Sequence, residues 1–168
     1  ESASEPPKSV LEVGVGTGVP FASHFNNRGS KVHGVDIALQ SVQKCKELNL
    51  GVQAIAADAE QLPYRENQFD ITFCFHSIPF ISRPELAIKE MVRVTRPGGL
   101  IFFDIQNFEN RKIKTGLIKE TEIEEISSDE NESFLKVQSK KIISDKDKRI
   151  HITGWKQSKM HGDKPAST

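Results

Sequence analysis

The hydrophobic positions of this chain fall in short runs that alternate with helix-like stretches up to Asn107. The runs are rich in β-branched and aromatic residues, which is typical of strands buried on both faces; they cover residues 9–13, 31–36, 52–57, 69–75 and 100–105. Stretches with helical spacing lie between them and cover residues 19–27, 39–49 and 85–94. Alternating strands and helices predict an α/β domain, with a parallel sheet and helices on both of its faces.

The pattern changes after Phe108. Strand-like runs at 121–126, 133–143 and 149–155 are separated by short polar turns, which predicts an antiparallel β meander. We therefore expect a core domain over 9–108 and a β appendage over 109–157. Residues 1–8 and 158–168 are polar and aperiodic, and we expect flexible ends there.

Composition narrows the classes of function. The 168 residues include 23 basic and 23 acidic ones, and a net charge of zero argues against binding nucleic acid or an anionic membrane through bulk charge. No apolar stretch approaches the roughly 20 residues of a membrane span, and residues 1–9 lack the apolar segment of a signal peptide. The two cysteines, Cys45 and Cys74, lie far apart, which predicts a reduced, cytoplasmic protein without a metal cluster.

The first predicted strand leads directly into three alternating glycines, Gly14, Gly16 and Gly18. Glycine permits a sharp turn and lets a ligand approach the backbone, and the start of the following helix offers free N–H groups. This arrangement favours an adenosine-containing ligand at the carboxyl edge of the sheet. A dinucleotide fingerprint would require glycine at position 19, where this chain has Val19, so a nicotinamide oxidoreductase is disfavoured.

Acidic residues follow the next two predicted strands. Asp36 stands about 20 residues after the glycines, where an acid accepts hydrogen bonds from ribose hydroxyls; the alternative is that it caps the helix at 39–49. Asp58 is placed to accept from an adenine amino group, with Ala59 and Leu62 against the ring, or else to cap a turn.

Taken together, these segments resemble the class I S-adenosylmethionine-dependent methyltransferases, of the small-molecule, methyltransferase type 11-like kind. Residues 11–18 resemble motif I, Asp36 matches the ribose-binding acid, and 57–64 resemble the adenine-side motif. Residues 69–78 and 90–101 resemble the fourth strand and the helix, turn and fifth strand that follow. The resemblance implies a Rossmann-like sheet with strand order 3-2-1-4-5, S-adenosyl-L-methionine as cofactor, and methyl transfer to a small-molecule acceptor.

The resemblance also implies a set of site residues. The cofactor-binding residues expected from it are Glu12, Gly14, Gly16, Gly18, Asp36, Ile37, Asp58, Ala59 and Phe75. Because the sulfonium methyl group is already electrophilic, the protein mainly holds the nucleophile in line and excludes water. A base is required only for an acceptor that arrives protonated; His76 is the predicted catalytic residue, and His24 is a weaker candidate.

An alternative function would use the same cofactor site. A non-catalytic sensor or regulatory subunit would bind S-adenosylmethionine or S-adenosylhomocysteine, and the family segments that are missing before and after the core favour that alternative and suggest a chain truncated at both ends. An exposed fifth strand would need a cover, such as the second subunit of a homodimer. Residues 75–80 lack the Asp/Asn-Pro-Pro-aromatic motif of nucleic-acid amino-methyltransferases, so neither a nucleic-acid nor a membrane partner is expected.

Overall fold

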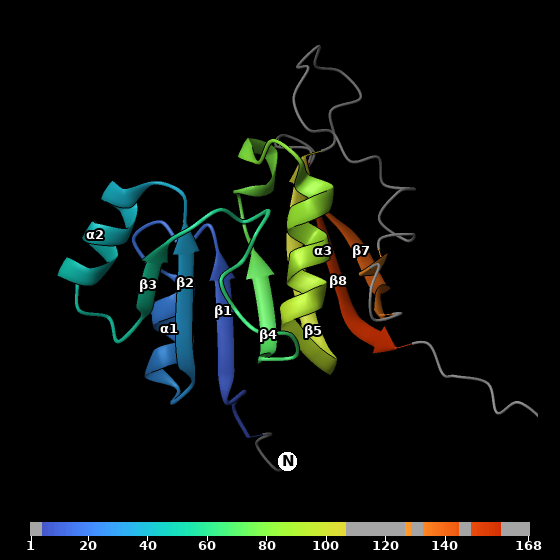
Figure 1. The fold of residues 1–168 in the computed structure, drawn as a ribbon, viewed down its shortest axis with the longest axis horizontal. Helices are drawn as coiled ribbons and strands as arrows, with labels where there is room; N and C mark the ends of the chain where they lie inside the picture. Colours follow the sequence, from blue (N-terminus) through green and yellow to red (C-terminus); the bar gives the residue numbers. More distant parts are fainter. Residues whose placement is uncertain (1–4, 107–126, 129–132, 145–148, 159–168) are drawn as a thin grey trace, which may run out of the picture.

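The computed structural model describes residues 5–106, 127–128, 133–144 and 149–158 (Figure 1). One mixed sheet forms the centre of the molecule. Its strands are β1 (Ser9–Val13), β2 (Lys31–Asp36), β3 (Gln53–Ala56), β4 (Phe69–Cys74), β5 (Thr95–Gln106), β6 (Ser127–Ser128), β7 (Ser133–Ser144) and β8 (Arg149–Ser158). The helices are α1 (Phe21–Asn27), α2 (Leu39–Glu47), the 3-10 turn η1 (Ile78–Phe80) and α3 (Pro84–Val94).

The first five strands are parallel and lie in the order β3-β2-β1-β4-β5, which confirms the predicted order. In the central strand β1, Val10 is in register with Val32 of β2 and with Ile71 of β4. Because all five strands run in one direction, their carboxyl ends meet at one edge of the sheet, the upper edge in Figure 1. Ligands of open α/β sheets bind at this edge.

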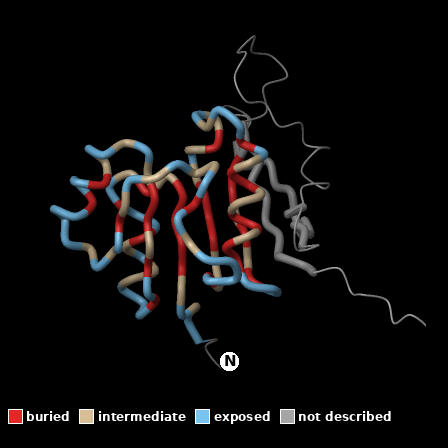
Figure 2. Tube along the Cα trace, in the orientation of Figure 1, coloured by how far each residue is buried: buried red, intermediate tan, exposed pale blue. Residues whose placement is uncertain are grey.

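Helices cover both faces of the parallel strands, as predicted. Neighbouring side chains of β1 point to opposite faces: Val10 packs in a cluster with Ala22 of α1 and Val42 of α2, whereas Leu11 packs in a cluster with Met91 of α3. Figure 2 shows the buried residues concentrated along the strands and the inner side of α3. Full burial of an aliphatic side chain contributes about 1.5–3 kcal/mol, so the fold is stabilised from both sides of the sheet.

The predicted antiparallel strands continue the main sheet. Strand β8 pairs antiparallel with β5 from Leu100↔Trp155 to Gln106↔Arg149, and β7 pairs with β8. The prediction that the fifth strand is an exposed edge is therefore wrong, because β8 satisfies its outward N–H and C=O groups. A second subunit is therefore not needed to cover β5, and a homodimer stays a prediction. The predicted run at 121–126 and the flexible tail at 159–168 lie outside the described residues.

Two differences concern the helices. The first helix begins at Phe21, so Val19 and Pro20 belong to the loop before it, and the second helix ends at Glu47, two residues before the predicted end.

No helix in the described part of the chain is long and apolar enough to cross a membrane.

Candidate functional site

The glycine loop after β1 is folded against the end of β2. The N–H groups of Gly14 and Val15 donate to the Val35 carbonyl oxygen at 2.7 and 2.9 Å. Gly14 and Gly16 have φ angles of +75° and +54°, in the left-handed region that favours glycine. A Cβ at Gly14 would lie 2.0 Å from the Oγ of Ser77, whereas one at Gly16 would meet nothing within 4 Å. Gly14 is therefore required by packing, and Gly16 faces open space.

Gly18 has a packing role of its own. Its φ angle is +81°, and a Cβ there would lie 2.9 Å from the Sγ of Cys45 on α2. In the helix that follows, two of the first N–H groups already have partners within the protein: that of Ala22 donates to Glu12 and that of Ser23 to the Gly18 carbonyl. These two amides are therefore not available to a ligand.

Asp36 ties the glycine loop to the start of α2. Its Oδ2 accepts a hydrogen bond from the N–H of Gly16 at 2.9 Å, and its Oδ1 accepts one from the N–H of Ala38 at 2.9 Å. Ala38 is the N-cap residue of α2 and no side chain caps this helix by a hydrogen bond, so Asp36 forms a local turn before the helix and the capping alternative is not realised. Because each carboxylate oxygen has two acceptor positions, the same side chain retains the capacity to accept from ligand hydroxyls.

Glu12 lies beneath the loop and is only 5% exposed. Its Oε2 accepts from the N–H of Ala22 at 3.0 Å, which links β1 to α1. Burial raises the pKa of the Glu12 carboxyl from an ordinary 4.5 to about 8; the hydrogen bond from Ala22 opposes the rise and the charge of Asp36 adds to it. Glu12 thus connects the strand before the glycine loop to the helix after it, and it is not among the residues that line the cavity at the carboxyl edge.

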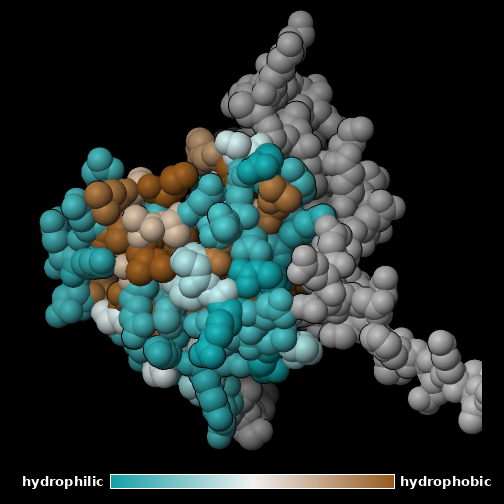
Figure 3. Space-filling model, in the orientation of Figure 1, coloured by the Kyte–Doolittle hydropathy of each residue, from teal (hydrophilic) through white to brown (hydrophobic). Residues whose placement is uncertain are grey.

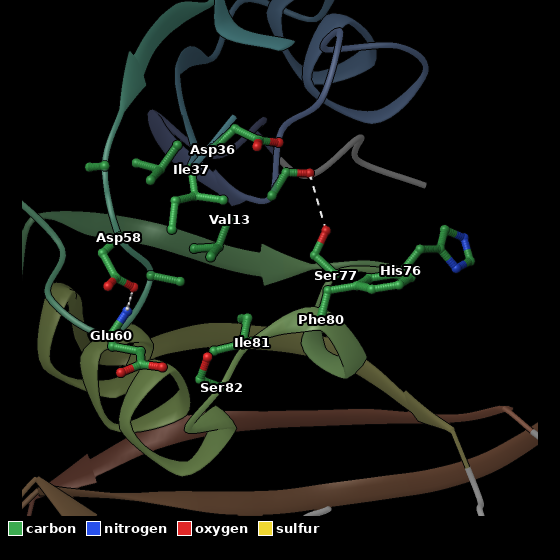
Figure 4. A pocket seen from close by; sticks show the side chains of 14 residues that line it. Val13, Asp36, Ile37, Asp58, Glu60, His76, Ser77, Phe80, Ile81 and Ser82 are labelled. Atoms are coloured by element: carbon green, nitrogen blue, oxygen red, sulfur yellow. Dashed lines mark hydrogen bonds between the residues drawn. The ribbon is translucent and has the colours of Figure 1, made fainter. Parts of the chain in front are cut away.

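A cavity of about 350 Å³ opens at the carboxyl edge of the sheet (Figure 4). Of the site residues predicted from the sequence, the structure brings six to its wall: Gly14, Asp36, Ile37, Asp58, Ala59 and His76. Glu12, Gly16, Gly18 and Phe75 are not on the wall; the ring of Phe75 packs against Phe21, with centroids 5.0 Å apart. The wall also includes Ser77 and Phe80, which sequence reasoning missed although they directly follow the fourth strand.

Exposed apolar residues lie beside the cavity. Figure 3 shows apolar residues gathered at the upper left of the molecule, toward the carboxyl edge of β1–β3 and around α2. The exposed large apolar side chains include Ile37, Leu39 and Phe80, which are 77%, 54% and 87% exposed. Ile37 and Phe80 both line the cavity, from opposite sides.

The loop after β3, which carries Asp58, is held in place by α3. Asp58 accepts from the N–H of Glu60 at 2.9 Å, a local turn, so the alternative that it caps a turn is realised. Further along, the N–H of Leu62 donates to Glu90 at 2.7 Å, and Arg93 donates to the Tyr64 carbonyl at 2.8 Å. Sequence reasoning missed this clamp, although an acidic and a basic residue three positions apart on one helix were the available signal.

His76 follows β4 in a left-handed conformation, with φ of +62°. Its backbone N–H donates to Oδ1 of Asp104 at 2.6 Å, and its ring Nδ1 lies 3.0 Å from Oδ2 of the same carboxylate. The His76 side chain is 51% exposed and that of Asp104 only 4%. Sequence reasoning missed Asp104, whose signal was an acid within the apolar run of the fifth strand. His24 is not among the residues that line the cavity.

Comparison with known proteins agrees with this geometry. The family model described as "Methyltransferase domain" matches residues 11–103. A malonyl-[acyl-carrier protein] O-methyltransferase of Buchnera aphidicola is 34% identical over 95 residues, which cover 56% of this chain and 38% of that protein. A ubiquinone biosynthesis O-methyltransferase of Pseudomonas putida is 34% identical over 115 residues, which cover 64% of this chain and 48% of that protein. The chain spans less than half the length of each of these relatives.

Solved structures share the fold. A SAM dependent methyltransferase from Aquifex aeolicus aligns with a TM-score of 0.67 at 20% identity, over 88% of this chain and 81% of that one. An S-adenosylmethionine dependent methyltransferase from Mesorhizobium loti aligns with a TM-score of 0.72 at 9% identity, over 91% and 93%. The family implies S-adenosyl-L-methionine as the cofactor. Since the family model covers more than half of the chain, including the glycine loop and the ends of β2–β4, this chain belongs to the methyltransferase domain family.

Proposed function

We propose that this domain binds S-adenosyl-L-methionine in the cavity at the carboxyl edge and transfers its methyl group to a small-molecule acceptor. The observation that carries the proposal is the convergence of the glycine loop and Asp36 on one open cavity, within the segment that matches the family. A volume of about 350 Å³ lies within the roughly 300–1,000 Å³ of small-molecule sites.

The residues of the wall suit the cofactor's chemical groups. Asp36 would accept hydrogen bonds from the ribose hydroxyls, and Asp58 would accept from the adenine amino group. Ile37 and Ala59 would contact the apolar faces of the adenine ring. Gly16 is not part of the wall, but a side chain there would meet nothing within 4 Å, so the backbone of the glycine loop would stay accessible to the rest of the cofactor.

The cofactor, when bound, supplies a methyl group that is already activated by its sulfonium. What remains for the protein is to position the acceptor and to exclude water. His76 and the exposed ring of Phe80 line the side of the cavity away from Asp36 and Asp58 (Figure 4). We assign that side to the acceptor, with His76 receiving a proton where the acceptor carries one.

The name of the Pseudomonas putida relative, which refers to ubiquinone biosynthesis, supports a small-molecule acceptor. The name of the Buchnera aphidicola relative refers instead to a malonyl group carried by acyl-carrier protein. We also propose that the protein is located in a soluble compartment such as the cytoplasm.

Calorimetric titration tests the binding half of this proposal. S-adenosylmethionine and S-adenosylhomocysteine should bind to the 168-residue chain, and NADH, which lacks the amino-acid part that both ligands carry, should not. Asp36→Ala should weaken the binding of both ligands by at least tenfold, because it removes the acceptor for the ribose hydroxyls. Asp70→Ala is the matched control: this carboxylate also accepts from a backbone N–H, that of Ser9, but at the amino edge of the sheet.

The outcomes separate the alternatives. Unchanged affinity in Asp36→Ala would contradict the ribose assignment, and an equal loss in Asp70→Ala would trace the effect to general destabilisation. Cofactor binding without transfer to any acceptor would favour a non-catalytic sensor or regulatory subunit.

A further inference from the structure

The ends of β4 and β5 bring together two residues that are 28 positions apart in the chain. The strands are parallel neighbours, with Cys74 in register with Phe103. His76 follows two residues after Cys74, and Asp104 follows directly after Phe103. Since parallel strands present their carboxyl ends at the same edge, the imidazole and the carboxylate meet beside the cavity.

Asp104 contacts both the backbone and the ring of His76. One carboxylate oxygen accepts from the backbone N–H at 2.6 Å, and the other lies 3.0 Å from Nδ1 of the ring. A left-handed conformation is unfavourable for a residue with a side chain, and these two contacts stabilise it at His76. The arrangement also sets the direction of the ring, which Figure 4 shows beyond Ser77 and turned away from Asp36.

The contact at Nδ1 determines where the ring carries its proton. An ionised carboxylate can only accept hydrogen bonds, so the ring nitrogen that faces it must be the donor. A neutral imidazole has one N–H, and with that hydrogen on Nδ1 the lone pair of the ring is on Nε2. The carboxylate is almost entirely buried and the imidazole is half-exposed, so the pair joins a buried anion to a ring at the cavity wall.

We propose that Asp104 is a positioning residue that holds His76 as the Nδ1-protonated tautomer, with Nε2 as the proton acceptor for a methyl acceptor that carries a weakly acidic hydroxyl, of the phenol or enol class. This inference rests on the proposed function. As the acceptor oxygen forms its bond to the methyl carbon, the carbon–sulfur bond of S-adenosylmethionine breaks and its electron pair goes to sulfur. The hydroxyl proton moves to Nε2, and the resulting imidazolium is stabilised by the Asp104 carboxylate. A carboxylate acceptor has no such proton, and this pair would have no part in its methylation.

The variant Asp104→Asn separates positioning from a purely structural role. Asparagine has the same shape but offers one oxygen and one NH₂ group. If its oxygen keeps the bond from the His76 backbone, its NH₂ group faces Nδ1, which must then accept. The ring proton then moves to Nε2. The loop keeps its shape, but Nε2 no longer has the lone pair that would accept a proton from the methyl acceptor.

Nitrogen NMR of the 168-residue chain labelled with ¹⁵N-histidine measures the tautomer directly, at a pH where the imidazole is neutral. The His76 signals are assigned by their absence in His76→Gln. We expect Nδ1–H in the unmodified chain, Nε2–H in Asp104→Asn, and no change in Asp70→Asn, a matched control at the opposite edge. Nε2–H in the unmodified chain, or the same tautomer in Asp104→Asn, would overturn the proposal.

Transfer assays with two probes test the acceptor class. With S-adenosylmethionine bound, catechol should be methylated and malonate should not, and Asp104→Asn should lower kcat for catechol by about 10²–10⁴-fold with an unchanged KM for the cofactor. Methylation of malonate alone, of neither probe, or of catechol at an equal rate in Asp104→Asn would contradict the assignment. Failure of the proposed function is distinguishable, because it would appear as absent cofactor binding in calorimetry, whereas the NMR measurement is made without cofactor or acceptor.

Discussion

The two edges of the parallel sheet use aspartates in the same way but leave them in different surroundings. At the amino edge, Asp70 accepts from the Ser9 N–H at 2.8 Å and pairs with Arg96 at 2.5 Å. At the carboxyl edge, Asp36 accepts from the N–H groups of Gly16 and Ala38 and borders the cavity. The charge of Asp70 is neutralised by Arg96, so this carboxylate serves the fold. Asp36 accepts from two backbone amides beside a cavity and can still accept a hydrogen bond from a ligand.

The carboxyl edge also contains an aspartate that is bound within the protein. Asp104 is also committed within the protein, yet its partner His76 is half-exposed at the cavity wall. The carboxyl edge therefore combines side chains that support the loops with side chains that face a ligand. Substitutions at the two edges should therefore affect the protein differently.

The largest effect is expected from added volume in the glycine loop. Gly14→Ala places a Cβ 2.0 Å from Oγ and 2.4 Å from Cβ of Ser77, and φ is unfavourable as well, so the loop must shift. We expect a loss of about 3–5 kcal/mol in the free energy of unfolding, measured by urea denaturation. Gly16→Ala is the control: it has only the φ penalty and should lose about 1–2 kcal/mol. Equal losses in the two variants would show that Ser77 does not constrain the loop.

An effect of similar size, but spread over several pH units, is expected at Glu12. Its pKa in the fold is about 8 against an ordinary 4.5, so its contribution to stability is complete below pH 4.5 and is lost as the pH rises through about 8. Glu12→Gln is neutral at every pH and keeps an oxygen for the Ala22 N–H. Between pH 5 and 8 the unmodified chain should lose about 1.4 kcal/mol per pH unit relative to the variant, as measured by denaturation at each pH. A constant difference would mean that Glu12 is ionised throughout.

The smallest effect is expected at the amino edge. Although desolvation opposes it, the hydrogen bonds from Arg96 and Ser9 hold the pKa of Asp70 below its ordinary 3.8. Its contribution to stability is therefore present above that pH and is lost as the pH falls through the lowered pKa. Since the ion pair is close to solvent, Asp70→Asn should cost roughly 1 kcal/mol or less at pH 7 and still less near pH 3. A cost that grows in acid would contradict this sign.

Periodicity and turn residues were enough to predict most of the fold. The parallel strands, the helices on both faces and the antiparallel pair after Phe108 follow from local patterns, and the strand order was implied by the family resemblance; the structure confirms them all. The edge of the sheet was predicted wrongly, because pairing of β5 with β8 joins residues about 50 positions apart and leaves no local signal.

The candidate site was predictable to the extent that it is built from single chain segments. The glycine loop, Asp36 and Asp58 each stand in a recognisable local context, and the residue types at those positions restrict the ligand they suit. The pairing of Asp104 with His76 and the collision that a side chain at Gly14 would make with Ser77 involve separate segments, so only the folded chain shows them.

The sequence by itself determined the class of fold, the position of the glycine loop and the acidic residues that follow the strands, because strand and helix periods and turn chemistry are local properties. The tertiary structure alone decided which of these residues face the cavity, which hold the loops, and which carboxylate orients His76. Those assignments depend on register between strands and on burial, and both are set by contacts between segments that are distant in the chain.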